Sequence, residues 1–194
     1  FIPYRLIHSG IFQPFSLFML QLFYHTYRGM NMKIRPMLLT DVDQVVQLEN
    51  KTWTSENTPG LIPVTSKEKI ITDFENGTHF LVAEENQVII GVLDYRPYYP
   101  FPSGRHIVTF GIAVFREKRG QGIGRQLIEE FFKVAQADDF QKVLIHVLST
   151  NLKAIAFYEK LGFHLEARLP KQFYIDKNYI DDLIFSYYLE ETYA

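Results

Sequence analysis

The sequence predicts one α/β domain in which helices cover both faces of a mixed, mostly antiparallel β-sheet. The chain has 194 residues, which corresponds to one domain plus an appendage at roughly 150 residues per domain. Its composition, 47% hydrophobic and 22% charged, is typical of a globular chain. From residue 32 onward, strand-like segments first come grouped and then alternate with helix-like segments, and this order favours a mixed sheet between two helical layers.

The appendage is residues 1–31, which contain no acidic residue and only two basic ones, Arg5 and Arg28. The apolar run 11–27 is shorter than the about 20 residues of a membrane-spanning helix and is interrupted by polar residues. No small-residue cleavage site of a signal peptide follows it. Because the chain does not start with methionine and one stands just before the first regular element, we predict a non-native or disordered extension and one domain at 32–194. A membrane anchor at 11–27 is the alternative.

Helices are predicted where apolar residues recur at helical spacing behind a capping pattern. Thr40 with Asp43 resembles a capping box, and Thr65 with Glu68 opens a second helix. A glycine-rich turn precedes a long helix, and Asn151 begins a short one. The predicted helices are 40–48, 65–75, 123–135 and 151–161.

Strands are predicted for apolar runs bounded by turn residues. A tight turn at 85–87 joins two of them, and another turn, Asp176-Lys177-Asn178, joins the last two. Two irregular, proline-containing loops, 52–64 and 96–105, separate the elements of the first half. The predicted strands are 33–37, 79–85, 88–95, 107–115, 142–148 and two that follow residue 163.

Composition excludes several classes of function. The chain contains no cysteine, so it has no disulfide framework, no thiol nucleophile and no cysteine-ligated zinc site. Its formal charge is −2, without the basic excess of a protein that follows a nucleic-acid backbone. We therefore expect neither a metal site nor a nucleic-acid partner.

The segment 116–125 joins the strand 107–115 to the start of the long helix and has the chemistry of an anion site. Glycines at 120, 122 and 124 allow unusual backbone angles and close approach, while the first turn of the helix offers unpaired N–H groups. Four cations and one acid surround them. No Lys-Ser/Thr follows the last glycine and the G-x-G-x-x-G spacing is missing, so this is neither a P-loop nor a dinucleotide fingerprint. A pyrophosphate is the simplest ligand, and a plain capped turn is the alternative.

Two motifs in this frame resemble those of the GCN5-related N-acetyltransferases, the GNAT family. Arg119-Gly-Gln-Gly-Ile-Gly124, behind the strand Thr-Phe-Gly-Ile-Ala-Val-Phe, is similar to the family's Q/R-x-x-G-x-G/A signature. Asn151-Leu-Lys-Ala-Ile-Ala-Phe-Tyr-Glu-Lys-Leu-Gly-Phe163 resembles its second signature, about 30 residues downstream. The resemblance covers residues 32–190 and implies the family's acyl-CoA N-acyltransferase fold, in which the sheet is splayed between two parallel strands.

The resemblance also implies a binding site for acetyl-CoA in the gap between strands 107–115 and 142–148. The backbone of Ile112, Ala113 and Val114 would hold the pantetheine arm and the oxyanion of the reaction. Asn151 would contact the cofactor arm, or serve only as a helix cap. The amides expected to bind the pyrophosphate are those of Arg119, Gly120, Gln121, Gly122, Ile123 and Gly124.

For catalysis, the resemblance points to Tyr158 as the acid that protonates the departing thiolate, because a phenol stays protonated at neutral pH. An aromatic packing role for Tyr158 is the alternative. The glutamate that many relatives carry on the cofactor-binding strand is absent here, so the general base stays open between Glu49, Asp94, His106 and solvent. Aromatic residues in or beside the two loops are expected near the acceptor or as caps of the sheet edge: Trp53, Tyr95, Tyr98, Tyr99 and Phe101.

The expected function is transfer of acetyl from acetyl-CoA to the primary amine of a small molecule or amino acid, by direct attack in a ternary complex. The absence of cysteine favours this direct route. Acetylation of protein N-termini or lysines is one alternative, and a non-catalytic acyl-CoA-binding module is another. We expect a cytoplasmic protein without a membrane partner, and both a monomer and a homodimer stay open.

Overall fold

The computed structural model describes residues 32–60 and 62–189, and the predicted extension 1–31 lies outside this range. Seven strands form one sheet in the order β1-β2-β3-β4-β5-β7-β6, and only the β4–β5 pair is parallel. The order of helices and strands along the chain is the predicted one. The elements are β1 (Met32–Pro36), α1 (Val42–Thr52), α2 (Lys67–Glu75), β2 (His79–Glu85), β3 (Val88–Pro97), β4 (Ile107–Val114), α3 (Ile123–Ala137), β5 (Lys142–Leu148), α4 (Leu152–Lys160), β6 (His164–Ile175) and β7 (Asn178–Tyr188), with short 3-10 turns at Leu39–Asp41, Pro102–Gly104 and Arg116–Lys118.

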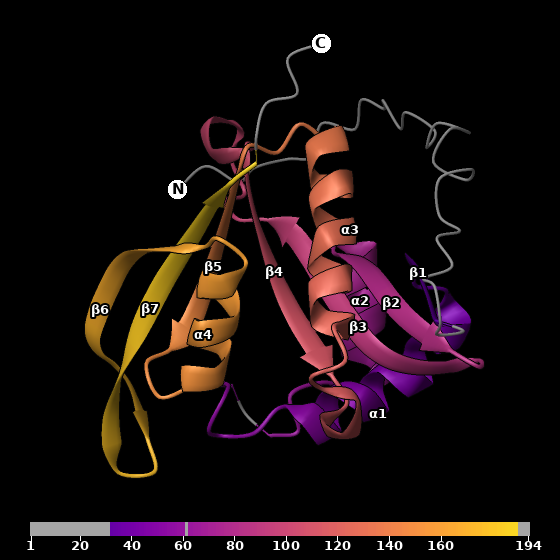
Figure 1. Cartoon of the computed structure of the whole chain (residues 1–194), viewed down its shortest axis with the longest axis horizontal. Helices are drawn as coiled ribbons and strands as arrows, with labels where there is room; N and C mark the ends of the chain where they lie inside the picture. Colours follow the sequence, from indigo (N-terminus) through magenta and orange to yellow (C-terminus); the bar gives the residue numbers. More distant parts are fainter. Residues whose placement is uncertain (1–31, 61, 190–194) are drawn as a thin grey trace, which may run out of the picture.

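Helices cover both faces of the sheet, as predicted. Figure 1 shows α3 and α4 in front of it and α1 and α2 behind it. The apolar core is divided accordingly: Phe131 of α3 packs with Phe110 on one face, and Leu48 of α1 packs with Val92 on the other. The sheet thus separates two chemical environments, which we call the α3/α4 face and the α1/α2 face.

Two predicted helix starts are wrong in detail. Helix α2 is capped by Ser66, whose side chain accepts a hydrogen bond from the Lys69 amide at 3.2 Å, rather than by Thr65. Helix α1 has no side-chain cap, and a 3-10 turn precedes it. Asp41 lies in that turn and uses its carboxylate for other partners.

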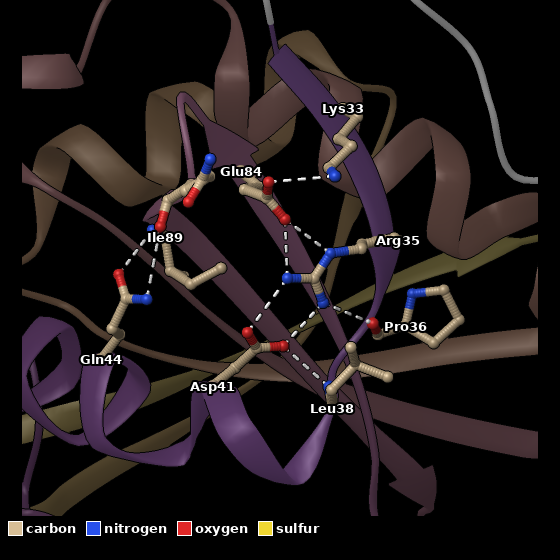
Figure 2. A network of polar contacts seen from close by, with 9 residues as sticks. Lys33, Arg35, Pro36, Leu38, Asp41, Gln44, Glu84 and Ile89 are labelled. Atoms are coloured by element: carbon tan, nitrogen blue, oxygen red, sulfur yellow. Dashed lines mark hydrogen bonds and ion pairs between the residues drawn. The ribbon is translucent and has the colours of Figure 1, made fainter.

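These partners form the polar network of Figure 2, which joins β1, β2 and the start of α1. Arg35 Nη1 donates to Asp41 Oδ2 at 2.6 Å, and Arg35 Nε donates to Glu84 Oε2 at 2.7 Å. The Leu38 amide donates to Asp41 at 2.8 Å, and Lys33 forms an ion pair with Glu84 at 3.0 Å. Because these contacts satisfy both carboxylates, the network fixes the edge of the sheet on which α1 begins.

The parallel pair β4–β5 separates soon after it forms. The strands are paired only at Ile107 with Lys142 and at Val108 with Val143, whereas β4 stays paired with β3 along its whole length. Figure 1 shows the two arrows diverging from their common start. The resulting seam between β4 and β5 leaves backbone groups of β4 without a partner among the described strands. This confirms the predicted sheet splayed between two parallel strands.

Candidate active site

The seam is lined by alternate backbone groups of β4. The His106 carbonyl accepts hydrogen bonds from the β5 side, and the Phe115 amide donates to Ile90 on the β3 side. Since backbone groups alternate along a strand, the N–H and C=O groups of Ile112 and Val114 face the seam, and those of Ala113 face β3. Two of the three residues expected to hold a pantetheine arm therefore present their main chain to the open side.

At the end of the seam, helix α3 begins with unpaired donors. Its N-cap is Gly122, which has no side chain to accept a hydrogen bond, and both Gly120 and Gly122 have positive φ, +79° and +83°. The amides of residues 120–125 have no acceptor within the described part of the chain. The Arg119 amide, in contrast, donates to the Arg116 carbonyl at 3.3 Å. The concave turn thus aims a row of N–H groups and the positive end of the helix dipole at one spot.

Gly124 brings this turn close to both sides of the seam. A Cβ at this position would lie 3.3 Å from Phe157 of α4 and 3.8 Å from Ile112 of β4. A Cβ there would require the Phe157 ring to shift by a few tenths of an ångström and would be in van der Waals contact with Ile112. The glycine therefore sets how closely the start of α3 approaches the seam.

The four cations of the turn divide into two pairs. Lys118 forms an ion pair with Glu85, and Arg125 pairs with Glu129 at 2.7 Å on the helix surface. Arg119 Nε donates to the Val114 carbonyl at 3.2 Å, and neither Arg119 nor Arg116 has an acidic partner among the described residues. Two guanidinium groups are thus available to an anion at the turn.

Asn151 is the N-cap of α4, because its Oδ1 accepts the Ala154 amide at 3.2 Å. Asn151 therefore has the helix-capping role that the sequence left open. This contact uses the carboxamide oxygen and leaves the amide nitrogen of Asn151, a donor, available to a ligand.

Tyr158 of α4 is packed against the seam on the α3/α4 face. Its side chain is 9% exposed, and its ring contacts Phe110 of β4 at a centroid distance of 6.0 Å and Phe163 at 5.5 Å. Its hydroxyl has no hydrogen-bond partner among the described residues. Burial raises the pKa of Tyr158 well above that of an exposed phenol, so the hydroxyl stays protonated at neutral pH.

On the opposite, α1/α2 face, a cavity of about 180 Å³ lies beside β3. This volume is slightly larger than the ~150 Å³ of engineered protein cavities that admit a benzene-sized molecule. Its wall combines apolar side chains with five ionisable ones. The lining residues are Glu49, Trp53, Thr58, Val64, Lys69, Ile70, Asp73, Phe80, Asp94 and Arg96.

Glu49 and Asp94, two of the open candidates for the base, lie together in this wall. Burial and the nearby Asp94 raise the pKa of Glu49 to about 7. Burial also raises the pKa of Asp94, although Arg96 Nη1 lies 3.4 Å from its Oδ2. Asp94 Oδ1 lies over Gly111 of β4, where a Cβ would be only 2.6 Å away. Asp94 therefore links the wall of the cavity to β4.

Two further candidates from the sequence lie elsewhere. His106, one of the open candidates for the base, lies just before β4, where β4 and β5 are still paired, and not at the open part of the seam. Tyr95 is buried on the α3/α4 face, stacked on His79 and packed on Phe131, and does not belong to the cavity. The Tyr95 side chain points away from the α1/α2 face, because side chains alternate along a strand and its neighbour Asp94 points toward that face.

The sequence reasoning missed a hydrogen-bonded chain on the other side of the seam. His146 Nδ1 lies 2.6 Å from Asp182 Oδ2, and its Nε2 lies 2.8 Å from the Tyr98 hydroxyl. Asp182 is 3% exposed. The signal was a histidine inside the apolar strand 142–148, but its partners come from β7 and from the loop after β3, and only the sheet order brings them together.

The structure thus places the turn 120–125, the open edge of β4, Asn151 and Tyr158 around one seam. The Glu49 cavity lies beside β3 on the other face, and its Asp94 lies over Gly111 of β4. Within residues 32–60 and 62–189, no group of three or more His, Asp or Glu side chains is arranged to hold a metal ion. In the same range no helix is both long and apolar enough to cross a bilayer.

Comparisons with known proteins agree with this geometry. The family model described as Acetyltransferase (GNAT) family matches residues 42–163. The N-alpha-acetyltransferase of Sulfolobus acidocaldarius is 30% identical over 158 residues, which is 77% of this chain and 89% of the relative. The L-amino acid N-acyltransferase MnaT of Escherichia coli is 27% identical over 95 residues, 49% of this chain and 55% of that protein. The crystal structure of smu.2055 from Streptococcus mutans UA159 has a TM-score of 0.80 and 61% identity, and the match covers 81% of this chain and 99% of that one.

Proposed function

Because the chain belongs to the acetyltransferase (GNAT) family, we propose that it transfers the acetyl group of acetyl-CoA to the primary amine of a small molecule or an amino acid, by direct attack in a ternary complex. The family makes the protein an acetyltransferase. Its co-substrate, its acceptor and the roles of its residues are our proposal, as are a cytoplasmic location and a reaction without a metal.

The observation that carries the proposal is the combination of an open β-strand edge with uncapped helix donors at its end. Ile112 and Val114 would bind the amide groups of the pantetheine arm as a strand partner does. The amides from Gly120 to Gly124 would bind the pyrophosphate, with Arg116 and Arg119 supplying positive charge. The Asn151 amide nitrogen would donate to the arm from α4.

Acetyl-CoA, when bound, supplies an activated acyl group on a thiol leaving group. Tyr158 would donate its hydroxyl proton to the departing sulfur. The burial that keeps Tyr158 protonated supports this role, since only the protonated phenol can donate. The chain has no cysteine to carry the acetyl group, which supports direct transfer to the amine.

Two glycine-to-alanine substitutions test the proposed pyrophosphate site at residues 120–124, which we call the cradle. Gly122 and Gly77 both have positive φ, +83° and +86°, and neither has a close neighbour where a Cβ would stand. Alanine at either site costs a similar backbone strain, roughly 1 kcal/mol. We expect Gly122→Ala to weaken acetyl-CoA binding about tenfold or more by calorimetry, because its methyl group enters the cradle, while Gly77→Ala binds as the parent protein does. Equal acetyl-CoA affinities of the two variants would contradict the assignment of the cradle as the pyrophosphate site.

The acceptor class is tested by thiol release. The cavity beside β3 has the volume of a small side chain, and one relative is named for L-amino acids, which supports small amines. A second candidate, acetylation of protein N-termini, is favoured by the N-alpha-acetyltransferase similarity over most of the chain. We expect faster release with amino acids or simple amines than with short peptides that carry a free N-terminus. The reverse order would select the second candidate, and binding of acetyl-CoA without thiol release from any amine would contradict both.

A further inference from the structure

We propose that the cavity between α1, α2 and β3 receives the ammonium group of the acceptor, that Glu49 is the catalytic residue that removes its proton, and that Asp94 holds it in position. This inference rests on the proposed function, because it assigns the acceptor side of the same reaction. It also selects one base from the four that the sequence left open.

Glu49 is a buried carboxylate in the wall of this cavity. The residue is 8% exposed, and its side chain forms no hydrogen bond or ion pair within the described part of the chain. Buried carboxylates are normally paired or hydrogen-bonded, since burying an isolated charge is costly. A cationic ligand would supply the missing partner, and an alkylammonium is a cation with three donors.

Asp94 connects the cavity with the reacting centre. Its Oδ1 lies against Gly111, and the residues on either side, Phe110 and Ile112, belong to the seam. The Phe110 ring contacts Tyr158 on the other face of the sheet. Asp94 and Tyr158 therefore lie against neighbouring residues of β4, Gly111 and Phe110, on opposite faces of the sheet, where β4 has already separated from β5. An amine held by Glu49 and Asp94 would face the thioester from the side opposite the acid.

The charges around Glu49 suit a proton acceptor. Asp94 and Asp73 raise its pKa and Lys69 lowers it, while Arg96 faces Asp94. The remaining lining residues do not titrate. Burial is the largest influence, and the resulting pKa of about 7 for Glu49 lies near neutral pH, where a general base is most effective.

The protons of the reaction balance with this assignment. The ammonium gives its first proton to Glu49, from which it passes to solvent. The free amine then forms the C–N bond as the C–S bond breaks, and the sulfur takes the Tyr158 proton. The second proton of the amine nitrogen returns Tyr158 to its protonated form, so the products are an amide, a thiol and one released proton.

Two glutamate-to-glutamine substitutions test the inference. Glu49→Gln removes the base without changing its size, and Glu130→Gln is the matched control, since Glu130 is 6% exposed but lies in α3 and pairs with Lys133 at 2.7 Å. We expect Glu49→Gln to lower kcat/KM for the acceptor about 10²-fold or more at pH 8. It should also abolish the rise of activity through pH 7. Glu130→Gln should keep the kcat/KM of the parent protein and the rise of its activity through pH 7. Acetyl-CoA affinity should be unchanged in both variants.

A readout apart from activity is the carboxyl titration of the free protein. With ¹³C-labelled glutamate, one signal should titrate near pH 7 and vanish in Glu49→Gln. In Asp94→Asn this signal should titrate at lower pH, because the charge of Asp94 raises the pKa of Glu49. Thermal melting at pH 8 should show Glu49→Gln no less stable than the parent, since the lost carboxylate has no partner.

Three outcomes would overturn the inference while leaving the proposed function intact. One is a Glu49→Gln variant that is correctly folded and as active as Glu130→Gln. Another is the absence of a glutamate that titrates near pH 7. The third is loss of the rise through pH 7 in His146→Gln, with retention in Glu49→Gln, which would move the base to the His146–Asp182 pair. Failure of the parent protein to release thiol with any amine would instead contradict the proposed function itself.

Discussion

Tyr158 carries the most specific residue-level prediction. Its hydroxyl has no hydrogen-bond partner among the described residues, so Tyr158→Phe removes the acid and leaves the ring contacts with Phe110 and Phe163. We expect kcat to fall about 10²-fold or more, with little change in acetyl-CoA affinity or melting temperature. Single-turnover thiol release and calorimetry measure the two quantities.

Tyr187 provides the control for that substitution. It is half-buried on the same face of the sheet, stacked on Phe132 at 4.5 Å, and lies in β7 away from the cradle. Tyr187→Phe should keep the parent kcat. If both tyrosine variants behave alike, Tyr158 is a packing residue, as the sequence allowed.

The site residues that could be predicted are those whose role is local. Positive φ at Gly120 and Gly122, and the cap at Asn151, follow from neighbours within a few residues, so spacing alone pointed to them. Glu49 and Asp94 are different. Each could be named as a possible base, but their shared cavity depends on how α1 packs on β3. The same holds for His146, whose partner Asp182 reaches it only through the β5–β7 pairing.

At the scale of elements, the network of Figure 2 decides how α1 attaches to the sheet. Burial works to raise the pKa of Asp41, but the hydrogen bonds from Arg35 and the Leu38 amide outweigh it and lower the pKa. The pKa of Glu84 is lowered in the same way, because the hydrogen bonds from Lys33 and Arg35 outweigh the effect of burial. Carboxyls with a lowered pKa stabilise the fold above their unfolded pKa, and this stability is lost as the pH falls through the folded value.

We therefore expect Asp41→Asn to lower the free energy of unfolding by on the order of 2 kcal/mol at neutral pH. The difference from the parent should shrink below about pH 4, where both carboxyls become protonated. Asp43→Asn, two residues away on the exposed surface, should have little effect. Denaturant titrations at several pH values measure this. A pH-independent difference would show that the ion pairs are not its source.

The same elements show where the sequence pattern failed. Thr40 and Asp43 have the spacing of a capping box, but the chain places Asp41 in a 3-10 turn and uses its carboxylate to bind Arg35. Asp41 accepts hydrogen bonds from both the nearby Leu38 amide and the Arg35 guanidinium, so this turn is closed by Asp41 and not by Thr40 and Asp43. Helix α2 shows the smaller error, a cap shifted from Thr65 to Ser66, because both residues have the hydroxyl that a cap needs.

At the scale of the whole molecule, the two faces of the sheet carry different parts of the proposed site. The α3/α4 face holds the uncapped helix start and Tyr158, and the α1/α2 face holds the acidic cavity. Residues of both sides lie against β4 after it leaves β5: Tyr158 contacts Phe110, and Asp94 lies over Gly111. This architecture was predictable because the order of elements favoured a sheet between two helical layers. The position of the cavity was not, since it depends on side chains from α1, α2, β2, β3 and the segment between α1 and α2, which are distant in sequence.

The division of the chain also leads to a prediction about residues 1–31. The described residues, 32–60 and 62–189, form two apolar cores and a seven-stranded sheet, and the first described strand begins at Met32, which is already buried. A chain beginning at Met32 should therefore melt within about 2 °C of the full chain and release thiol at the same rate. Both chains should also fractionate alike after cell lysis. A melting point lower by several degrees, or recovery of only the full chain with membranes, would instead assign residues 1–31 a structural or anchoring role.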